Sequence, residues 1–521
     1  MLRITSHATF STDSDSGWPL FDTPTTRQME QLYASHLPAH CLMQRAGLAV
    51  AQLAMAIAPH AQRIWIACGP GNNGGDGFEA AAQLKALRPQ TEILVSQVRE
   101  STRLPADAQA SWLRAQAAGV LWVDECPAIM GHQDLCIDAL LGIGVKSQNA
   151  GTPNADQRKL LQLLKQVQRS SCPVLCVDIA SGLDADTGQY HADFAPEAAP
   201  ISTRHTLALL TLHPGLFTAQ GRDACGQVWS DDLSCPPLAQ HHPVARLSTQ
   251  APSSGHTDHH TRPHASHKGS FGDVAILGGE GLGHRGLSMT GAAWLAALAA
   301  LHTGAGRVML ALLDAESSTT QAIAPWPEIM LRQPQAQDWQ QATVVCGCGG
   351  GQAIMAWLPA VLQQAPRLVL DADALNAVAA APALATLLKE RATRQQATVL
   401  TPHPLEAARL LQTSTQSVQA NRLHAATALA QQFQCTVLLK GSGTIIASPH
   451  STPWINSTGN ALLARGGTGD VLAGLIGALW ASGCSAEQAA VRGAFRHGQV
   501  ADDWPCGTPF SASALALHLG D

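Results

Sequence analysis

The sequence predicts an α/β protein of two domains, each with a mostly parallel sheet between layers of helices. Short apolar runs typical of buried strands alternate with Ala- and Leu-rich runs typical of helices. One segment, Cys235–Ser270, interrupts this alternation, because it is rich in Pro, Ser, Thr and His and lacks apolar periodicity. We therefore predict domains at residues 20–235 and 267–521, joined by a linker at 236–266.

Composition excludes several classes of protein. The chain has 521 residues, 46% hydrophobic and 13% charged, which suffices for two large cores. Its formal net charge is -6 and it has no basic stripe, so nucleic acid is not an expected partner. No apolar run is long enough to span a membrane, and the N-terminus lacks the apolar core of a signal peptide. We expect a cytoplasmic homo-oligomer.

The cysteines predict reduced thiols. There are 13 of them, scattered and without a C-x-x-C pair, so neither a disulfide framework nor a structural zinc site is expected. Cys346 and Cys348 lie two apart in a glycine-rich turn, and we expect no redox role for them.

In the first half, polar residues follow predicted strands. Strands are expected at Arg63–Cys68 and Thr91–Val98, with a helix between them. "LCIDALLGIG" and "PVLCVDIASG" each contain an apolar strand ending in an aspartate, Asp138 and Asp178. Ligands of parallel sheets bind at the carboxyl ends of strands, so these aspartates are candidate site residues.

The loop "GPGNNGGDGF", Gly69 to Phe78, lies between the first of these strands and the helix. Its G-x-G-x-x-G pattern lets the backbone approach an anionic ligand at a helix N-terminus. It also carries Asn72, Asn73 and Asp76, which a loop that only cradles a pyrophosphate does not need. A tight strand–helix turn is the alternative for the glycines, and a helix cap is the alternative for each strand-end aspartate. Together these carboxylate and amide groups suit a hard cation or proton transfer.

Four stretches together, "LMQRAG", "GPGNNGGDGF", "DALLGIG" and "VDIASGLDADTG", resemble the N-terminal epimerase domain of NAD(P)H-hydrate repair enzymes, over about Thr25 to Ser234. The resemblance implies a Rossmann-like three-layer α/β/α sandwich, with Asp178 as the acid/base residue. It implies potassium at Asn73, Asp138 and Ser181. One departure is Ala180, where the family usually has proline. The implied contacts to the hydrated dinucleotide are Asn72, Asn73, Gly74, Gly75, Asp76, Gly142, Ile143, Gly144, Val145, Lys146, Ser147 and Gln148.

In the second half, "ARGGTGDVLAGLIGALWA", Ala464 to Ala481, opens a long apolar helix with a glycine-rich turn. Free N–H groups at this helix start suit a phosphate or a developing anion. Asp470 stands beside them. It is either an ordinary N-terminal charge or the base that takes a proton from an attacking hydroxyl. No Walker A pattern is present.

This helix start resembles the ribokinase superfamily. With "HKGSFGDVAILGG", "LVLDADALN", "VLTPHPLEAARLL" and "VLLKGSGTII" it resembles, more narrowly, the ADP-dependent NAD(P)H-hydrate dehydratase domain, from about His267 to the end. The resemblance implies a ribokinase-like α/β/α sandwich and ADP as co-substrate, accompanied by magnesium. Two loops depart from the family: "GCGGG", Gly347 to Gly351, replaces Gly-Pro-Gly-Leu-Gly, and Ala461 replaces a proline.

By the same resemblance, Lys440, Gly441, Ser442, Gly443, Thr444 and Gly469 hold the nucleotide, Ala292, Gly351, His403 and Asp470 contact the hydrate, and Asp373 and Asn376 lie near the phosphates.

The predicted function is repair of hydrated NADH and NADPH (NADHX and NADPHX). The first domain would interconvert the R and S hydrates. The second would dehydrate the S hydrate with ADP, releasing AMP and phosphate. Two alternatives stay open: a vitamin-precursor kinase with an accessory domain, and a non-catalytic metabolite-binding or scaffold protein. A kinase would not need the "NNGGD" and "VDIASG" loops.

Overall fold

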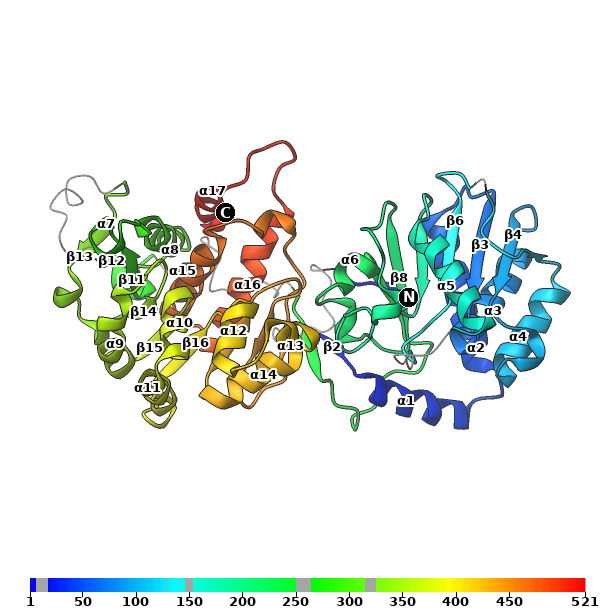
Figure 1. Ribbon diagram of the computed structural model, residues 1–521, viewed down its shortest axis with the longest axis horizontal. Helices are drawn as coiled ribbons and strands as arrows, with labels where there is room; N and C mark the ends of the chain where they lie inside the picture. The colour runs from blue at the N-terminus through cyan, green and yellow to red at the C-terminus, as the bar shows by residue number, and fades with distance from the viewer. Residues whose placement is uncertain (6–16, 129, 146–152, 250–263, 314–324, 521) are drawn as a thin grey trace. The chain divides into compact units, whose positions relative to one another are not determined.

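The computed structural model describes residues 1–5, 17–128, 130–145, 153–249, 264–313 and 325–520. The chain divides into two compact units, and the division falls between Ala245 and Arg246. Each unit is a sheet covered by helices, so the predicted two-domain α/β fold is confirmed (Figure 1).

The first unit is built on an eight-stranded sheet in which only the edge strand β1 is antiparallel to its neighbour. Each of the central strands is a short apolar run buried on both faces, as parallel strands between helices require. In order across the sheet, the strands are β1 (Leu2–Arg3), β9 (Gln227–Asp231), β8 (Arg204–Leu209), β7 (Val174–Val177), β6 (Leu135–Ala139), β3 (Arg63–Cys68), β4 (Glu92–Gln97) and β5 (Leu121–Trp122).

Helices cover both faces of this sheet. The helices α2 (Cys41–Ile57), α3 (Asn72–Leu87) and α4 (Ala106–Ala117) share one core with alternate residues of the central strands. Helix α5 (Ala155–Gln168) buries three of its leucines outside that core, against the other face (Figure 1). Other elements described in this unit include β2 (Trp18–Leu20), α1 (Thr23–His36) and α6 (Gly221–Cys225).

The second unit has a sheet that is parallel from β13 to β17 and continues through antiparallel β18 and β19 to β10. In order, these strands are β13 (Ile329–Arg332), β12 (Arg307–Leu313), β11 (Asp273–Glu280), β14 (Thr343–Cys346), β15 (Arg367–Leu370), β16 (Ala397–Leu400), β17 (Thr436–Leu439), β18 (Ile445–Ala447), β19 (Trp454–Ile455) and β10 (Ala245–Leu247).

The core on one face of this sheet is formed by α8 (Thr290–His302), α15 (Thr468–Ala481), α16 (Ala486–Asp502) and α17 (Ala512–Leu517). The α15 sequence is apolar nearly all round, and twelve of its residues are buried, as expected of a central core helix. The other α-helices among the described residues of the unit are α7 (Leu282–Arg285), α9 (Leu358–Gln364), α10 (Ala372–Ala380), α11 (Pro382–Thr393), α12 (Pro404–Leu411), α13 (Thr415–Ala420) and α14 (Arg422–Phe433).

The predicted linker is wrong for part of its length. Strand β10 lies inside the segment 236–266 and pairs with β19 through Arg246 and Leu247. Ala245 and Leu247 are buried, and the Ser248 hydroxyl donates to Asn456 Oδ1 at 3.2 Å. Three residues with one charge between two apolar side chains are too short a pattern to stand out from a Pro/Ser/His-rich background. Residues 250–263 lie outside the described residues, and the remaining domain limits stay predictions.

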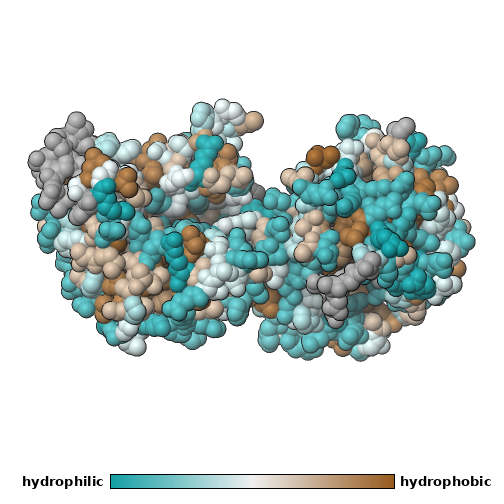
Figure 2. Space-filling view, viewed as in Figure 1, coloured by the Kyte–Doolittle hydropathy of each residue, from teal (hydrophilic) through white to brown (hydrophobic). Residues whose placement is uncertain are grey.

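All 13 cysteines are free thiols in the structure, and their reduced state in solution stays a prediction. No helix among the described residues is long and apolar enough to cross a membrane. On the face shown in Figure 2, hydrophobic side chains are scattered among hydrophilic ones on both units.

Candidate active sites

Three loops meet at the carboxyl edge of the first sheet. Strands β7, β6 and β3 are adjacent and parallel, so the loops after them start side by side. These are the loops in which the sequence placed Asp178, Asp138 and Asn73. The expectation that parallel strands gather these residues at one edge is therefore met.

Asp138 and Ser181 form one buried cluster. The Ser181 hydroxyl donates to Asp138 Oδ1 at 2.6 Å, and the Ser181 amide donates to Oδ2 at 3.1 Å. Both residues are at most 2% exposed. Burial raises the pKa of Asp138, while these hydrogen bonds oppose the rise. This pair ties the ends of β6 and β7 together and presents carboxylate and hydroxyl oxygens.

Asn73 and Asp178 lie on either side of Gly142. A Cβ placed on Gly142 would meet Asp178 Oδ2 at 3.2 Å and the Asn73 amide carbon at 3.3 Å. A methyl group on Gly142 would therefore be tight and would require one of these side chains to shift by a few tenths of an ångström. Among the described residues, Asn73 Nδ2 is buried without a hydrogen-bond partner. Because amide oxygen and nitrogen exchange on rotation, this buried atom can present a carbonyl oxygen to a ligand.

Asp178 has the electrostatics of a proton-transfer group. Burial raises its pKa to about 6, although the Ile143 amide donates to Oδ2 at 3.3 Å and opposes the rise. Its backbone is left-handed, with φ 70, an uncommon conformation that Asp and Asn tolerate best. Asp76 lies close enough for the two carboxylates to repel. Burial, followed by Asp178, raises the pKa of Asp76 well above its usual value.

The loop glycines serve packing as well as ligand approach. A Cβ on Gly74 would lie 2.1 Å from the Gly69 carbonyl oxygen, and one on Gly75 would collide with Met43. Asn72 is exposed at the start of α3. Val145 is the last described residue of the second loop, because Lys146, Ser147 and Gln148 lie outside the described residues.

Helix α1 contributes two charged residues that the sequence did not single out. It is fixed by Thr23, whose amide donates to Asp186 Oδ1 at 2.8 Å, and by its N-cap Asp22. Glu30 is a charged neighbour that raises the pKa of both Asp76 and Asp178. Arg27 is one turn away, and a Cβ on Gly144 would lie 3.2 Å from its Nη2. No local pattern links α1 to the Asp76 loop or to the more distant loops that carry Gly144 and Asp178, so only the fold could reveal this.

The second candidate site lies at the carboxyl ends of β14, β15 and β17. Lys440, after β17, donates from Nζ to Asp371 Oδ1 at 2.7 Å, and the Thr401 hydroxyl donates to the same oxygen at 2.8 Å. A Cβ on Gly469 would lie 3.4 Å from Lys440 Nζ. The ammonium group is therefore at the N-terminus of α15, as the predicted nucleotide site requires.

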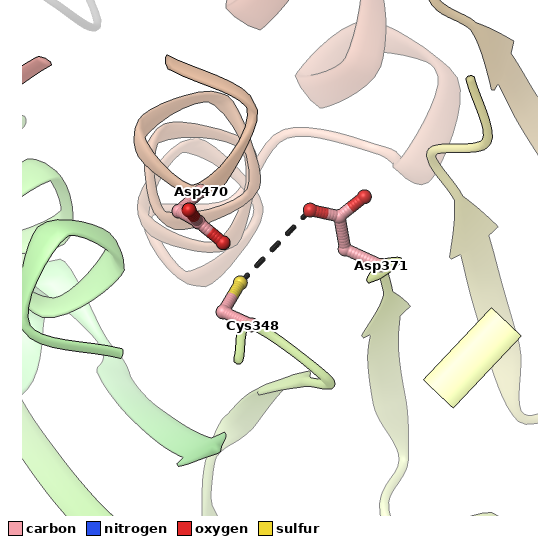
Figure 3. A group of neighbouring side chains, drawn as sticks. All are labelled: Cys348, Asp371 and Asp470. Carbon is pink, nitrogen blue, oxygen red and sulfur yellow. Dashed lines mark hydrogen bonds between the residues drawn. The ribbon is translucent and has the colours of Figure 1, made fainter. Parts of the chain in front are cut away.

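Asp470 lies in the first turn of α15, and its pKa is raised to about 6. Burial is the main cause and the charge of Asp371 adds to it, while Cys348 and Lys440 oppose the rise. Figure 3 shows the Cys348 thiol lying between the two carboxylates. Its sulfur is 4.0 Å from Asp371 Oδ2, and one oxygen of each carboxylate and the sulfur lie within 4.8 Å of one another. The ammonium of Lys440 already neutralises Asp371, so we assign no ion to this group.

Of the other residues predicted for this site, Gly351, Asp373 and Ala292 lie at one turn, whereas Asn376 is bound by a neighbouring arginine. Gly351 donates from its amide to Asp373 Oδ2 at 2.8 Å and has φ 54, so the turn and the "DADALN" stretch are joined. Ala292, in α8, lies against Gly349 of the same turn. Asn376 is instead engaged by Arg409, whose Nη1 donates to Oδ1 at 2.6 Å.

His403 has a structural role that the sequence analysis did not assign. It is the N-cap of α12, and its Nδ1 accepts from the Leu405 and Glu406 amides at 3.1 and 3.3 Å. Its Nε2 faces Glu406 Oε1 at 3.1 Å. A ring fixed in this way keeps one orientation whether or not it also contacts a ligand.

The predicted nucleotide loop, Lys440 to Thr444, rests on a buried arginine that the sequence analysis missed. Arg422 Nη2 donates to the Lys440 carbonyl at 3.2 Å, and a Cβ on Gly441 would lie 2.8 Å from Nη1. Gly441 and Gly443 have φ 136 and 59, which explains the glycines of this loop. The Thr444 hydroxyl donates to the Gly441 carbonyl at 3.1 Å and closes it.

Comparison with known families gives one match for each unit. Residues 39–215 match the family described as YjeF-related protein N-terminus. Residues 276–519 match the family described as NAD(P)H-hydrate dehydratase.

Individual relatives match over both units or over the second. The bifunctional NAD(P)H-hydrate repair enzyme of Escherichia coli is 34% identical over 481 residues, which cover 88% of this chain and 84% of that protein. The ADP-dependent (S)-NAD(P)H-hydrate dehydratase of Neisseria meningitidis is 41% identical over 252 residues, covering 46% and 80%. A solved structure of the ADP/ATP-dependent NAD(P)H-hydrate dehydratase of Bacillus subtilis, co-crystallised with ATP and Mg²⁺, is 28% identical, with a TM-score of 0.40 over 50% of this chain and 91% of that one.

Proposed function

Because the chain belongs to the family of bifunctional NAD(P)H-hydrate repair enzymes, we propose that its two units carry out successive steps on one damaged cofactor. The first unit interconverts the R and S hydrates of NADH and NADPH. The second uses ADP to dehydrate the S hydrate, which regenerates the reduced cofactor and releases AMP and phosphate. The observation that carries this proposal is a carboxyl group with a pKa of about 6 at the carboxyl edge of each sheet, Asp178 and Asp470.

In the first unit, Asp178 is the proton-transfer residue. Inversion at the ring carbon that bears the hydroxyl requires a proton to be removed and returned, and a pKa near the working pH suits both directions. Asp178 adjoins Asn73 across Gly142, so a hydrate held by the Asn-rich loop would lie against the carboxyl group. The negative charge of Glu30 adds to burial in keeping part of the proton on Asp178.

Asn73, Asp138 and Ser181 would hold a potassium ion. The donor set consists of oxygens, which hard cations prefer. Two observations support the fit: Asp138 and Ser181 are already in contact, and the buried Asn73 amide has an atom without a partner among the described residues. A bound cation would add positive charge beside Asp178. It would help to hold an anionic substrate.

In the second unit, Asp470 would accept the proton of the hydrate's hydroxyl as its oxygen attacks the β-phosphorus of ADP. The bond from that phosphorus to the AMP oxygen breaks, and AMP leaves. Phosphate is a far better leaving group than hydroxide, so the ring carbon–oxygen bond then breaks and loss of a ring proton restores the double bond. Lys440 and the free N–H groups at the start of α15 stabilise the charge that develops on the phosphates.

Magnesium is proposed to accompany ADP and would supply neutralising charge to its phosphates. A homo-oligomeric state and a cytoplasmic location remain predictions from the sequence.

Asp470→Asn tests the dehydratase assignment. The substituted asparagine keeps the size of the side chain but cannot accept the proton, so turnover of the S hydrate with ADP should fall by at least about 10²-fold. ADP affinity, measured by calorimetry, should survive because Lys440 and the helix N-terminus do not need the carboxylate. If Asp470 is only a favourable N-terminal charge, the variant loses about 0.3–1 kcal/mol of stability and keeps its turnover.

A further inference from the structure

The thiol of Cys348 occupies an unusual position beside the proposed base. Cys348 follows β14 in the "GCGGG" turn, is fully buried, and lies between Asp371 at the end of β15 and Asp470 at the start of α15 (Figure 3). Its backbone is fixed, because the Gly279 amide donates to the Cys348 carbonyl at 2.9 Å. The Cys348 side chain has two possible roles: it fills space in the turn, or it acts on the two neighbouring carboxylates.

The two carboxylates do not need the thiol equally. Asp371 Oδ1 already accepts from Lys440 and from Thr401. Asp470 forms no ion pair among the described residues, and one of its carboxylate oxygens lies within 4.8 Å of the Cys348 sulfur. Burial and the nearby carboxylates raise the pKa of the thiol well above its usual value, so it stays protonated at every working pH and remains a donor. The one S–H of Cys348 donates to Asp371 Oδ2 at 4.0 Å and is within reach of Asp470, and of these two carboxylates Asp470 is the one without an ammonium partner.

We propose that Cys348 is a positioning residue of the dehydratase site: its thiol donates to Asp470 and holds that carboxylate, in its ionised form, toward the hydroxyl that is to be phosphorylated. This rests on the proposed function, in which Asp470 is the base. The chain Lys440–Asp371–Cys348–Asp470 then connects the nucleotide-binding ammonium to the base, with successive separations of 2.7 Å, 4.0 Å and at most 4.8 Å.

The role predicts a pH effect, and its sign follows from the surroundings of Asp470. Removal of a donor to the ionised form disfavours that form, so the base should lose its proton at a higher pH. His497 of α16 donates from Nε2 to the Thr468 carbonyl at 2.9 Å, and burial lowers the pKa of His497 to about 4, so it stays neutral above pH 5. The charged or titratable groups facing Asp470 from the packed elements are Asp371, Asp373, Lys440 and Cys348.

The test is the pH profile of kcat for the S hydrate with saturating ADP, recorded from pH 5 to pH 8.5 for the full chain and three variants. In Cys348→Ala the apparent pKa at which kcat falls on the acid side, or limb, of the profile should rise by about half a unit. The shift is small because a thiol is a weak hydrogen-bond donor. That shift is about a threefold loss at pH 5.5, with little change at pH 8. Cys348→Ser keeps a donor, and its limb should stay close to the native one.

Cys346→Ala is the matched control. Cys346 is as buried as Cys348, but only burial acts on its thiol and no carboxylate faces it. Its variant should keep the native limb. Each profile compares rates within one preparation, so a misfolded fraction does not change its shape.

An unshifted limb in Cys348→Ala, or an equal shift in the alanine and serine variants, would overturn the proposal. Loss of turnover in Asp470→Asn combined with an unshifted Cys348→Ala profile would remove only this inference. Normal turnover in Asp470→Asn would remove the proposed function as well.

Discussion

Replacement of Asp178 by Asn should stabilise the first unit while it stops epimerisation. The usual pKa of an aspartate is 3.8, and in the folded unit that of Asp178 is about 6. A difference of about two units corresponds to about 3 kcal/mol between the two protonation states. Asp178 is partly accessible to solvent, so we halve this value to about 1.5 kcal/mol. The substituted asparagine can still accept the Ile143 amide, and Asn tolerates the left-handed backbone of this position.

The sign of the pH dependence follows from the raised pKa. Between about pH 4 and pH 6 the folded unit retains a proton that the unfolded chain has lost, so native stability falls as pH rises through this window and then levels. The Asn variant carries no such cost. Its advantage should be absent near pH 4, grow toward pH 6 and remain constant above.

Scanning calorimetry of the full chain at pH 4.5 and pH 7.5 measures this. A gain of about 1.5 kcal/mol corresponds to about 3–6 °C for a domain of this size. Excess ADP raises the transition of the second unit and so identifies the other transition. Asp178→Ala also removes the charge but must place an alanine at φ 70, so it should gain less than Asn. A transition that does not rise in Asp178→Asn at pH 7.5, or rises equally at both pH values, would refute the reasoning.

Two further predictions concern the same unit. Exchange of potassium for sodium should lower the epimerisation rate and leave dehydration of the S hydrate unchanged. Ser181→Ala should weaken this response to potassium, because the hydrogen-bonded pair of Ser181 and Asp138 is the part of the ion site that is already assembled. Equal epimerisation rates with and without potassium would show that no functional ion binds there. Gly142→Ala should lower the epimerisation rate by about tenfold. The new methyl group would lie 3.2 Å from Asp178 Oδ2 and 3.3 Å from the Asn73 side chain, and it would displace one of them. An unchanged rate would mean that these two side chains do not act together.

The sequence predicted the parts of the sites that follow from strand order. Asn73, Asp138 and Asp178 each follow an apolar run, and adjacent parallel strands bring such residues to one edge. Lys440 follows β17 and reaches the second edge for the same reason, whereas Asp470 comes to it from the first turn of α15. These placements depend only on alternating β and α segments, which composition and periodicity reveal.

What the sequence did not show depends on packing between distant segments. Glu30 reaches the first site because α1 is held across the ends of the strands by Asp22 and Thr23. Arg422 lies under the Gly441 turn, although nothing in its own helix indicates a ligand. Strand β10 was hidden because three residues form too short a pattern. Such contacts have no local signature.

The central claim is that the two units catalyse separate steps on a hydrate that both can bind. Its most direct measurement is NADH formation from the pure R hydrate with ADP, after subtraction of the enzyme-free rate, for Asp178→Asn alone, Asp470→Asn alone and an equal mixture of the two. The account predicts that neither variant forms NADH from the R hydrate, that Asp178→Asn still converts the S hydrate, and that the mixture converts the R hydrate again. Conversion of the R hydrate by Asp178→Asn alone at the native rate, or a mixture no better than its components, would contradict it.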